Sequence, residues 1–292
     1  MNQKAFAQIP KVIKSPWGRR LLLDRTRVMG IINVTPDSFY ENSRKQTVEE
    51  ILLTAGKMIR EGADILDIGG MSTRPGSDPV AESEEEKRIL PAVKAIRENY
   101  PDIMISVDTY RANVAQKALD AGADIVNDIS GFAFDSDLIE VIAQNRVPYI
   151  LMHIKGTPKD MQKNPGYTDL MAEMMEYFAE KIDFLTTRHV DEDQILIDPG
   201  IGFGKRVEDN LEILYRMEEF KQLQKPILIA ASRKSFIGKV LSLDSPAERL
   251  EGTLAVTALC AWRNIDMVRV HDVKENVRII QMVEAIKCRG QY

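Results

Sequence analysis

The feature that most constrains this chain is a pattern that recurs along most of its length. A short apolar run ends in small polar residues, and an amphipathic stretch follows. The runs, rich in β-branched residues, are typical of buried strands, and the stretches between them have helical periodicity. The runs are VMGIIN (28–33), DILDIGG (64–70), IMISVDT (103–109), DIVNDISG (124–131), YILMH (149–153), ILIDPG (195–200), ILIAAS (227–232) and DMVRVHD (266–272). Strands that alternate with helices predict parallel pairing through crossover helices.

Eight strand–helix units in roughly 260 residues match a (β/α)8 barrel in number and in length. We therefore predict an α/β protein with one domain over residues 1–292, a TIM barrel whose barrel proper covers about 27–288. A doubly wound open sheet is the alternative, but no GxGxxG follows the first strand and eight units are many for one open sheet. The segment before Val28, with its Pro16-Trp17-Gly18 turn, is expected to form a hairpin that plugs the base of the barrel.

Composition narrows the possible partners and location. The formal net charge of −5 argues against a general binder of nucleic acid or of anionic membranes. Two cysteines, Cys260 and Cys288, are too few for a disulfide framework or a zinc site, which favours a reducing compartment. No apolar run approaches the length of a membrane span, and residues 1–20 carry charges and prolines where a signal peptide needs an apolar stretch. We expect a cytoplasmic protein with no nucleic-acid or membrane partner.

Polar side chains stand at the end of nearly every predicted strand. In TIM barrels, the carboxyl ends of the strands carry the active site. The residues there are Asn33, Gly69-Gly70, Asp108, Asn127 with Asp128, His153, Asp198, Ser232 to Ser235, and Arg269 with His271. Any one of them alone is more often a helix cap or a structural histidine than a ligand. Their convergence on one rim predicts a site.

The last two strands carry cationic groups. Residues i and i+2 of a strand point the same way, so Arg269 and His271 are expected to project together. A guanidinium beside an imidazole is suited to binding an anion, and phosphate sites in barrels often follow strands seven and eight. Lys234 adds a positive charge close by. We therefore predict an anion clamp at this part of the rim.

A second group lies lower on the barrel wall and combines acceptors with one amide. Asp108 and Asp198 can each accept two parallel N–H bonds, and Asn127 can donate and accept at once. This combination suits a flat heterocycle with an amino group next to a ring N–H, while Lys234 donates to a ring carbonyl. Guanine and pterin both have such an edge. The residues thus predict an aminopyrimidinone-type ring inside the barrel and a phosphorylated group at its rim.

Seven blocks of the sequence resemble the signature blocks of dihydropteroate synthase, in the order of that family. They are GIINVTPDSF (30–39), DIGGMSTRPG (67–76), DTYRANVAQKALDAGADIVNDISG (108–131), MHIKGTP (152–158), DPGIGFGK (198–205), ASRKSFIG (231–238) and RVHDV (269–273). The resemblance implies a (β/α)8 barrel that joins 6-hydroxymethyl-7,8-dihydropterin pyrophosphate to p-aminobenzoate. The implied products are 7,8-dihydropteroate and pyrophosphate, formed by an SN1-like path.

The resemblance also implies a role for individual residues. The catalytic set is Asp108, Asp198, Lys234, Arg269 and His271. The pterin pocket is Asp108, Asn127, Asp198 and Lys234, and the pyrophosphate site is Arg269, His271 and Thr73. The p-aminobenzoate site is Arg74, Pro75, Lys234 and Ser235, with Phe203 as an apolar wall that the glycines of 198–205 help to place. The implied cofactor is Mg2+, held by Asn33 together with pyrophosphate oxygens, and the implied assembly is a homodimer through outer helices such as 254–262.

Two departures from the family pattern affect loops. Met71 stands where the family usually has an acidic residue, and residues 40–45 lack the usual glycines of the first loop. Both are expected to affect turnover and p-aminobenzoate affinity more than the type of reaction.

Three other functions stay open at this point. The first is a methyltetrahydrofolate–corrinoid methyltransferase, which has no need for an anion clamp. The second is a catalytically silent pterin-binding paralogue, although no pocket residue is missing. The third is a phosphosugar barrel, which has no need for the acid-rich floor.

Overall fold

The structure, a computed structural model, describes residues 11–34, 44–71, 80–163 and 165–289, without the side chains of 44–47. Eight parallel strands form one sheet in the order β8-β7-β6-β5-β4-β3-β10-β9. Their bounds are β3 (Arg27–Asn33), β4 (Ile65–Gly69), β5 (Met104–Asp108), β6 (Ile125–Asp128), β7 (Tyr149–Met152), β8 (Ile195–Asp198), β9 (Leu228–Ile229) and β10 (Met267–Val270). A parallel bridge between Ile197 and Ile227 links β8 to β9. The sheet therefore curls into a nearly closed barrel.

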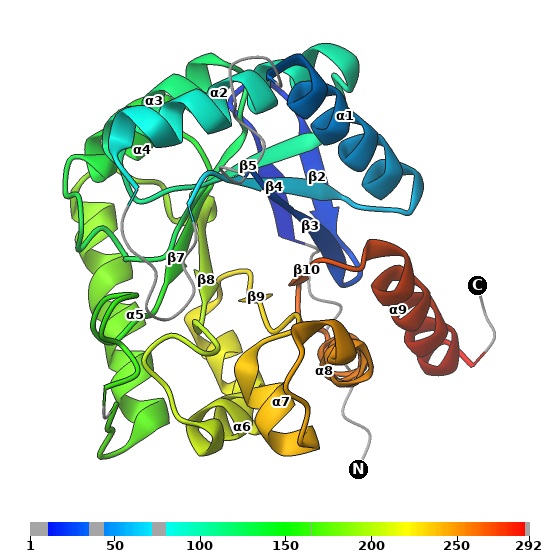
Figure 1. Cartoon of the computed structure of the whole chain (residues 1–292). Coiled ribbons are helices and arrows are strands. Elements are labelled where there is room, and N and C mark those ends of the chain that lie inside the picture. Colours follow the sequence, from blue (N-terminus) through cyan, green and yellow to red (C-terminus); the bar gives the residue numbers. More distant parts are fainter. Residues whose placement is uncertain (1–10, 35–43, 72–79, 164, 290–292) are drawn as a thin grey trace.

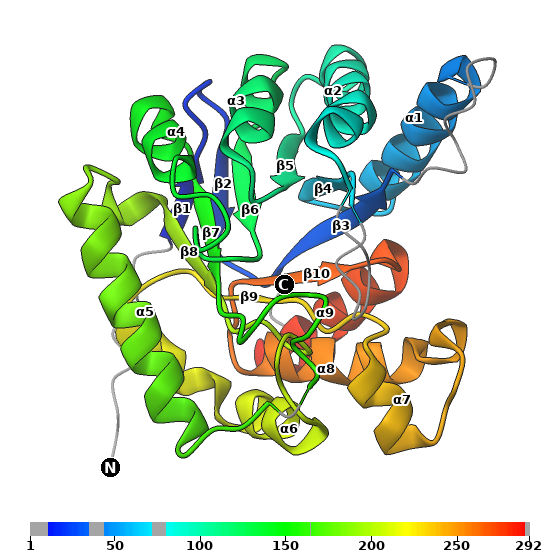
Figure 2. The same cartoon turned by 60° about the vertical axis from the view of Figure 1, so that its left-hand side comes forward.

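Helices surround the outside of these strands (Figures 1 and 2). The α-helices are α1 (Arg44–Arg60), α2 (Glu82–Asn99), α3 (Ala112–Asp120), α4 (Leu138–Asn145), α5 (Leu170–Thr187), α6 (Val207–Arg216), α7 (Ser235–Leu241), α8 (Leu250–Trp262) and α9 (Val273–Lys287). The 3-10 segments in the described part of the chain are Glu192–Gln194, Met217–Leu223 and Pro246–Glu248. A large cluster of buried side chains packs the helices onto the strands, with Ile89, Phe178 and Phe220 among its fully buried members.

Local chemistry accounts for where two of these helices begin or end. The side chain of Asp169 accepts a hydrogen bond from the Ala172 amide at 3.1 Å, so α5 begins at Leu170 with a side-chain cap. Arg146 has a φ of 49°, in the left-handed region, and α4 therefore ends at Asn145.

The interior of the barrel is sealed at its amino-terminal end. Strands β1 (Lys11–Lys14) and β2 (Arg20–Leu23) form an antiparallel hairpin. Ile13 and Leu23 of this hairpin are buried against one inward side chain from each barrel strand. These eight are Met29, Ile65, Met104, Ile125, Ile150, Leu196, Leu228 and Met267. The predicted hairpin plug is thus confirmed, since layers of apolar side chains fill the base of the barrel.

A buried carboxylate ties the hairpin to the barrel. Asp124, which directly precedes β6, accepts hydrogen bonds from Ser15 Oγ at 2.5 Å and Arg19 Nε at 2.8 Å. It also accepts from Arg97 Nη2 of α2 at 2.5 Å and from the Ile105 amide at 2.9 Å. Two arginines therefore balance one fully buried aspartate.

All eight predicted strands are present, and the predicted TIM barrel is confirmed. The open-sheet alternative is wrong, because β8 and β9, the two ends of the sheet order, are joined by the bridge at Ile197. The seventh strand is shorter than the run 227–232 suggests, since it covers only Leu228–Ile229. Within the described residues, no helix combines the length and the apolar character that a membrane crossing requires.

Candidate active site

The polar floor of the barrel lies one layer above the plug. Because inward side chains recur at every second residue of a strand, the next inward layer is two residues beyond the plug. That layer consists of Ile31, Asp67, Ser106, Asn127, Met152, Asp198, Ala230 and Arg269. Four strands thus contribute a carboxylate, a hydroxyl or an amide, and β10 contributes a guanidinium. The interior changes from apolar to polar within two residues.

Arg269 of β10 is joined by hydrogen bonds to β4 and β5. Its Nε donates to Asp67 Oδ2 at 2.5 Å, and its Nη2 donates to Asp108 Oδ2 at 2.6 Å. Asn127 Nδ2 donates to the same Asp67 oxygen at 3.3 Å. The structure thus brings together the predicted residues Asp108, Asn127 and Arg269. Arg269, predicted to face an anion, is also an ion-pair partner of Asp67 in this layer and of Asp108, which stands two residues beyond Ser106 on β5.

Asp67 was not among the residues predicted from the sequence. It is fully buried in β4, and its second carboxylate oxygen, Oδ1, has no hydrogen-bond partner among the described residues. A buried carboxylate needs such partners, so this oxygen is an unused acceptor on the floor. Its signal in the sequence was parity, because Asp67 stands two residues after Ile65 of the plug layer.

Burial and neighbouring charges shift the pKa values of two carboxyl groups of the site, those of Asp108 and Asp198. Burial raises the pKa of Asp108 to about 7, although Arg269 opposes this shift, and the nearby Asp67 adds to it. Burial also raises the pKa of Asp198, against the effect of Lys234 and of the Gly200 amide. The two carboxylates are therefore poised to respond to the charge of a bound group, as active-site acids often are.

Lys234 lies at the rim, where it directly precedes the first residue of α7. Burial lowers its pKa to about 8, while Asp198 opposes that shift. Its Nζ donates to the carbonyl of Ile201 and lies 4.6 Å from the centroid of the Phe203 ring. Ser235, the first residue of α7, is exposed. Lys234 and Phe203, both predicted to contact the second substrate, are thus neighbours.

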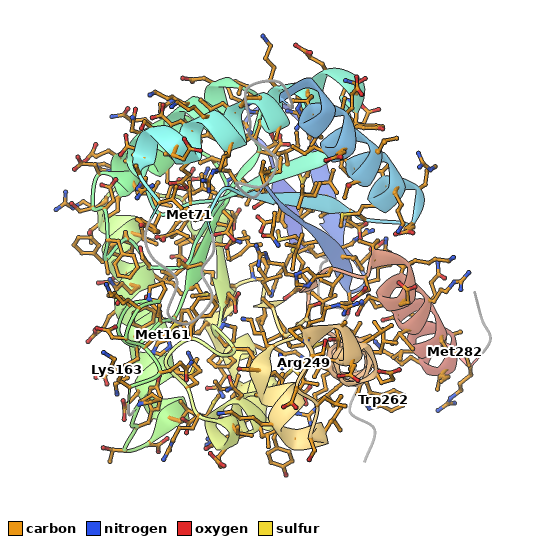
Figure 3. The ribbon with its side chains drawn as sticks, in the orientation of Figure 1. Met71, Met161, Lys163, Arg249, Trp262 and Met282 are labelled. Carbon is orange, nitrogen blue, oxygen red and sulfur yellow. The ribbon has the colours of Figure 1, made fainter. Side chains whose placement is uncertain are left out.

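Apolar side chains form the remaining wall of the mouth. Phe203 packs in a small buried cluster with Ile129, Met152 and Met161, and two more side chains, Tyr110 and Ile154, border it. Figure 3 labels Met161 among the side chains of this region. A flat ring that entered the barrel would therefore meet an apolar surface on one side and the polar floor below, a common arrangement in ligand pockets.

The loop after β8 depends on glycine at two positions. The Gly200 amide donates to Asp198 Oδ1 at 2.7 Å. A Cβ at Gly200 would lie 2.0 Å from the His153 carbonyl oxygen, and one at Gly204 would lie 2.3 Å from the Lys155 carbonyl oxygen. Both glycines also have positive φ, of 67° and 63°. Any larger residue would therefore push this loop away from the end of β7.

His271 is held by a serine from the neighbouring strand end. Ser232 Oγ lies 3.0 Å from His271 Nδ1, and the His271 amide donates to the same Oγ at 3.2 Å. Ser232 was noted at the rim from the sequence but was not assigned a role. Because it contacts the ring nitrogen, it fixes the orientation of the imidazole.

Other polar residues at the strand ends have structural partners. Asp128 points away from the floor and accepts hydrogen bonds from Tyr149 Oη at 2.7 Å and from the Phe132 amide at 2.6 Å. Arg233 forms two hydrogen bonds with Asp272, at 2.8 and 2.7 Å. These residues shape the turns around the rim. Neighbouring residues of a strand point to opposite sides, so Asp128 points outward where Asn127 points inward.

The predicted metal ligand lies beside the floor. A Cβ built on Gly69 would be 3.6 Å from Asp108 Oδ2 and 3.8 Å from Asn33 Oδ1, so these two oxygens border the same small space. In the described part of the chain, no group of three or more His, Cys, Asp or Glu side chains could hold a metal ion by itself. An amide oxygen with few other protein donors suits Mg2+ that is bound mainly through phosphate oxygens and water. Residues Thr73, Arg74 and Pro75 lie outside the described residues.

This geometry limits the chemistry of the site. Carboxylates and an amide at the floor can accept from and donate to the edge of a heterocycle, and the cations above them can stabilise a leaving anion. Neither cysteine stands at a strand end, because Cys260 lies in α8 and Cys288 directly follows α9. The arrangement favours binding and charge stabilisation over covalent catalysis.

Comparisons with known proteins identify the family. Residues 29–271 match the family described as pterin binding enzyme. The dihydropteroate synthase of Synechocystis sp. is 44% identical over 270 residues, covering 92% of this chain and 91% of that protein. The Xanthomonas albilineans dihydropteroate synthase with 4-aminobenzoic acid has a TM-score of 0.88 at 37% identity, covering 95% of this chain and 98% of that one. The structure of the enzyme from that organism in complex with 7,8-dihydropteroate has a TM-score of 0.84 at 34% identity and covers 94% and 98%. This chain therefore belongs to the pterin binding enzyme family and, within it, to the dihydropteroate synthases, which are transferases.

Proposed function

We propose that this chain joins 6-hydroxymethyl-7,8-dihydropterin pyrophosphate to p-aminobenzoate and releases 7,8-dihydropteroate and pyrophosphate. The observation that carries the proposal is the buried polar interior, where Arg269 bonds Asp108 and Asp67, and where Asn127 and Asp198 are also buried. Relatives in the same family carry the name of this reaction, and one has been solved with 7,8-dihydropteroate. The chemistry of the residues and the family membership support the same substrate class.

The pterin ring is proposed to lie on this floor. Asp198 and Asp108 would accept from the amino group and the ring nitrogens, and Asn127 would complete the edge. Lys234 would donate to the ring carbonyl, because its ammonium group lies at the rim beside Phe203. Two carboxylates beside the ring would stabilise positive charge that develops on it.

The pyrophosphate is proposed to leave toward the rim, past Arg269 of β10 and His271, which directly follows that strand. Thr73 would contribute from the second loop. Asn33 would hold Mg2+, which supplies further positive charge to the leaving oxygens when it is bound. Ser232 would keep the His271 imidazole oriented, since its hydroxyl contacts Nδ1. The neutralisation of the leaving group by these side chains lowers the barrier to its departure.

The reaction is proposed to follow an SN1-like path. The bond between the pterin methylene carbon and the pyrophosphate oxygen breaks, and its electron pair leaves with the pyrophosphate. The electron-rich dihydropterin ring spreads the positive charge of the carbon. The p-aminobenzoate nitrogen then forms the new C–N bond and releases a proton to solvent. Phe203, Lys234, Ser235, Arg74 and Pro75 would position the p-aminobenzoate.

We also propose that residues 1–292 form one pterin-binding domain with the barrel over about 27–288. The first barrel strand begins at Arg27 and the last helix ends at Lys287, which supports these bounds. The cytoplasmic location expected from the sequence stays a prediction.

A homodimer is proposed through α8 and α9. Trp262, Met282 and Ile286 are exposed on these helices, and Figure 3 places Trp262 and Met282 at the outer edge, away from the strands. Large exposed apolar side chains that gather on one face are typical of an interface. Light scattering should therefore give twice the chain mass, and Trp262→Glu should shift the protein toward the monomer. A monomeric wild-type protein would contradict this part of the proposal.

The test of the reaction is pyrophosphate release by the purified protein with dihydropterin pyrophosphate and Mg2+, with and without p-aminobenzoate. Lys234→Ala and Arg269→Ala are compared with Lys239→Ala, which removes an exposed lysine of α7, the helix that Lys234 precedes. We expect release that requires p-aminobenzoate, falls at least about 100-fold in the two site variants and is unchanged in the control. Tight pterin binding without any turnover would instead identify a silent pterin-binding paralogue, with Met71 and residues 40–45 as the first positions to revert.

A further inference from the structure

Lys205 is a buried lysine that the proposed reaction does not use. It ends the DPGIGFGK segment, and only 2% of its surface is exposed. Its Nζ lies 2.9 Å from His153 Nδ1 and donates to the carbonyl oxygens of His153 at 3.2 Å and Phe203 at 3.0 Å. The three donors of an ammonium group are thus all used, and none of these partners is a carboxylate. Lysine is almost never fully buried unless it is paired, so these three contacts are what allow the burial of Lys205.

His153 acts as a rigid anchor for this lysine. Burial and the charge of Lys205 lower the pKa of His153 well below its ordinary value, so the imidazole is neutral. A neutral ring that accepts at Nδ1 from an ammonium group carries its proton on Nε2. The ring is also enclosed by Tyr177, whose centroid lies 4.8 Å away in an edge-on contact, and by Tyr167 and Phe178. His153 therefore presents a fixed acceptor to Lys205.

The lysine connects the end of β7 to the loop after β8. The backbone amide of His153 donates to the Asp198 carbonyl at 3.0 Å. The ammonium group of Lys205 donates to the carbonyl oxygens of both His153 and Phe203. Gly200 leaves no room for a Cβ against the His153 carbonyl, so the loop lies directly on this residue. One ammonium group thus fixes the backbone between Asp198 and Phe203, the two residues that the loop presents to the pocket.

The charge of Lys205 also acts on Asp198. Burial lowers the pKa of Lys205 to about 7, and it faces Asp198 and Asp209, which raise that pKa, and Lys234, which lowers it. In turn, the positive charges of Lys234, Arg269 and Lys205 oppose the rise that burial causes in the pKa of Asp198. When Lys205 is protonated, it therefore favours the carboxylate form of Asp198, the form that accepts hydrogen bonds.

We propose that Lys205, anchored by His153, is a positioning residue for pterin recognition, which holds the loop after β8 in place and, with it, the carboxylate of Asp198. The inference deepens the proposed function and rests on it. Lys205 does not touch substrate, so its loss should weaken the use of the pterin substrate without removing a reacting group.

The test begins with Lys205→Met, which keeps an unbranched apolar side chain but removes the charge and the donors. We expect kcat/KM for dihydropterin pyrophosphate to fall at least about tenfold, mainly through KM. We also expect the acidic limb of the pH profile of pterin affinity to move to higher pH, because Asp198 loses a supporting charge. Lys163→Met is the control, since Lys163 is an exposed lysine near Met161 (Figure 3) and its loss removes the same charge.

A second pair of variants separates positioning from folding. His153→Asn places an amide oxygen near the position of Nδ1 and should keep most activity, whereas His153→Leu removes the acceptor and should behave like Lys205→Met. Circular dichroism checks that each variant is folded, and the His153 pair still gives an answer if Lys205→Met does not fold.

The outcomes distinguish the two proposals. Folded Lys205→Met and His153→Leu with wild-type kcat/KM and an unchanged pH profile would overturn the inference. Equal losses in His153→Asn and His153→Leu would also overturn it, because the acceptor at Nδ1 would not matter. An inactive wild-type protein would instead contradict the proposed function, and the role of Lys205 would then be decided by pterin affinity in the same variants.

Discussion

Gly200→Ala is the change that tests the loop after β8 most severely. The Gly200 amide donates to Asp198 Oδ1, and its backbone lies against the end of β7. The substitution adds one methyl group without changing charge or polarity. Its effect therefore reports only how tightly the loop is packed and what its conformation requires.

The magnitude follows from two contributions. The φ of Gly200 is 67°, and a residue with a Cβ in the left-handed region costs about 1–2 kcal/mol. The new Cβ would also lie 2.0 Å from the His153 carbonyl oxygen, where backbone must move to relieve the contact, and overpacking of this kind costs about 1–3 kcal/mol. The free energy of unfolding should thus fall by about 2–5 kcal/mol. At about 2 °C per kcal/mol for a chain of this size, the Tm should fall by about 4–10 °C.

Two other glycines provide matched controls. Gly18 has a φ of 87°, but no atom lies within 4 Å of an added Cβ, so Gly18→Ala meets only the conformational cost. Gly166 has neither a positive φ nor an atom within 4 Å, so Gly166→Ala should be neutral or slightly stabilising. Thermal unfolding followed by circular dichroism should show the largest loss of stability in Gly200→Ala, a smaller loss in Gly18→Ala and none in Gly166→Ala. Gly200→Ala should also lose pterin affinity. If Gly200→Ala were as stable as Gly18→Ala, the close packing of the loop on β7 would be refuted.

Three further predictions concern other parts of the molecule. Ser232→Ala removes the hydroxyl that contacts His271 Nδ1, and the KM for the pyrophosphate substrate should rise about 5- to 10-fold, as one lost hydrogen bond predicts; an unchanged KM would mean that the serine does not orient the ring. Asp124→Asn leaves two arginines without a buried carboxylate and should lower the free energy of unfolding by about 3 kcal/mol in urea denaturation, whereas a loss below about 1 kcal/mol would contradict the role of Asp124 in tying the hairpin to the barrel. Burial lowers the pKa of Lys234 to about 8, so its ammonium form is lost as the pH rises through that value, and pterin affinity measured by calorimetry should fall between pH 7 and 9. In Lys234→Arg, which stays charged, that alkaline fall should disappear; its persistence would assign it to another group.

Much of the fold could be predicted because the barrel repeats one local pattern. Each strand run is apolar and β-branched, and each ends where polar residues begin, so the eight strands follow from the sequence. The hairpin plug was predictable from the turn at Pro16-Trp17-Gly18. The short β9 was not, because its shortness depends on how the barrel closes at Ile197 and Ile227 rather than on its composition.

The site was predictable where residues end a strand and less so elsewhere. Asp108, Asn127 and Arg269 follow apolar runs or share their parity, and the structure brings them together through hydrogen bonds. Asp67 was missed because it lies inside a strand, where its apolar neighbours Leu66 and Ile68 hide it. Only counting alternate residues from the plug layer reveals that it points inward.

Lys205 was missed for a different reason. In the sequence it is one polar residue after a glycine-rich loop, and such a lysine is usually solvated. Two of its three hydrogen bonds involve His153, far away in the sequence, so only the packing of β7 against β8 explains its burial. Thr73, Arg74 and Pro75 lie outside the described residues, and their roles stay predictions.

The most direct test of the central claim is the affinity of a pterin for the floor of the barrel. Calorimetry would compare 6-hydroxymethylpterin pyrophosphate binding to the wild-type protein, to Asn127→Leu and to the control Asn145→Leu, which changes an asparagine on α4. The account predicts tight one-to-one binding to the wild-type protein and no change in the control. Binding to Asn127→Leu should be at least about 100-fold weaker, because the floor loses the amide while the acids beside it stay buried. Equal affinity in all three proteins would contradict it, because the ring would then bind somewhere other than among Asp108, Asn127 and Asp198.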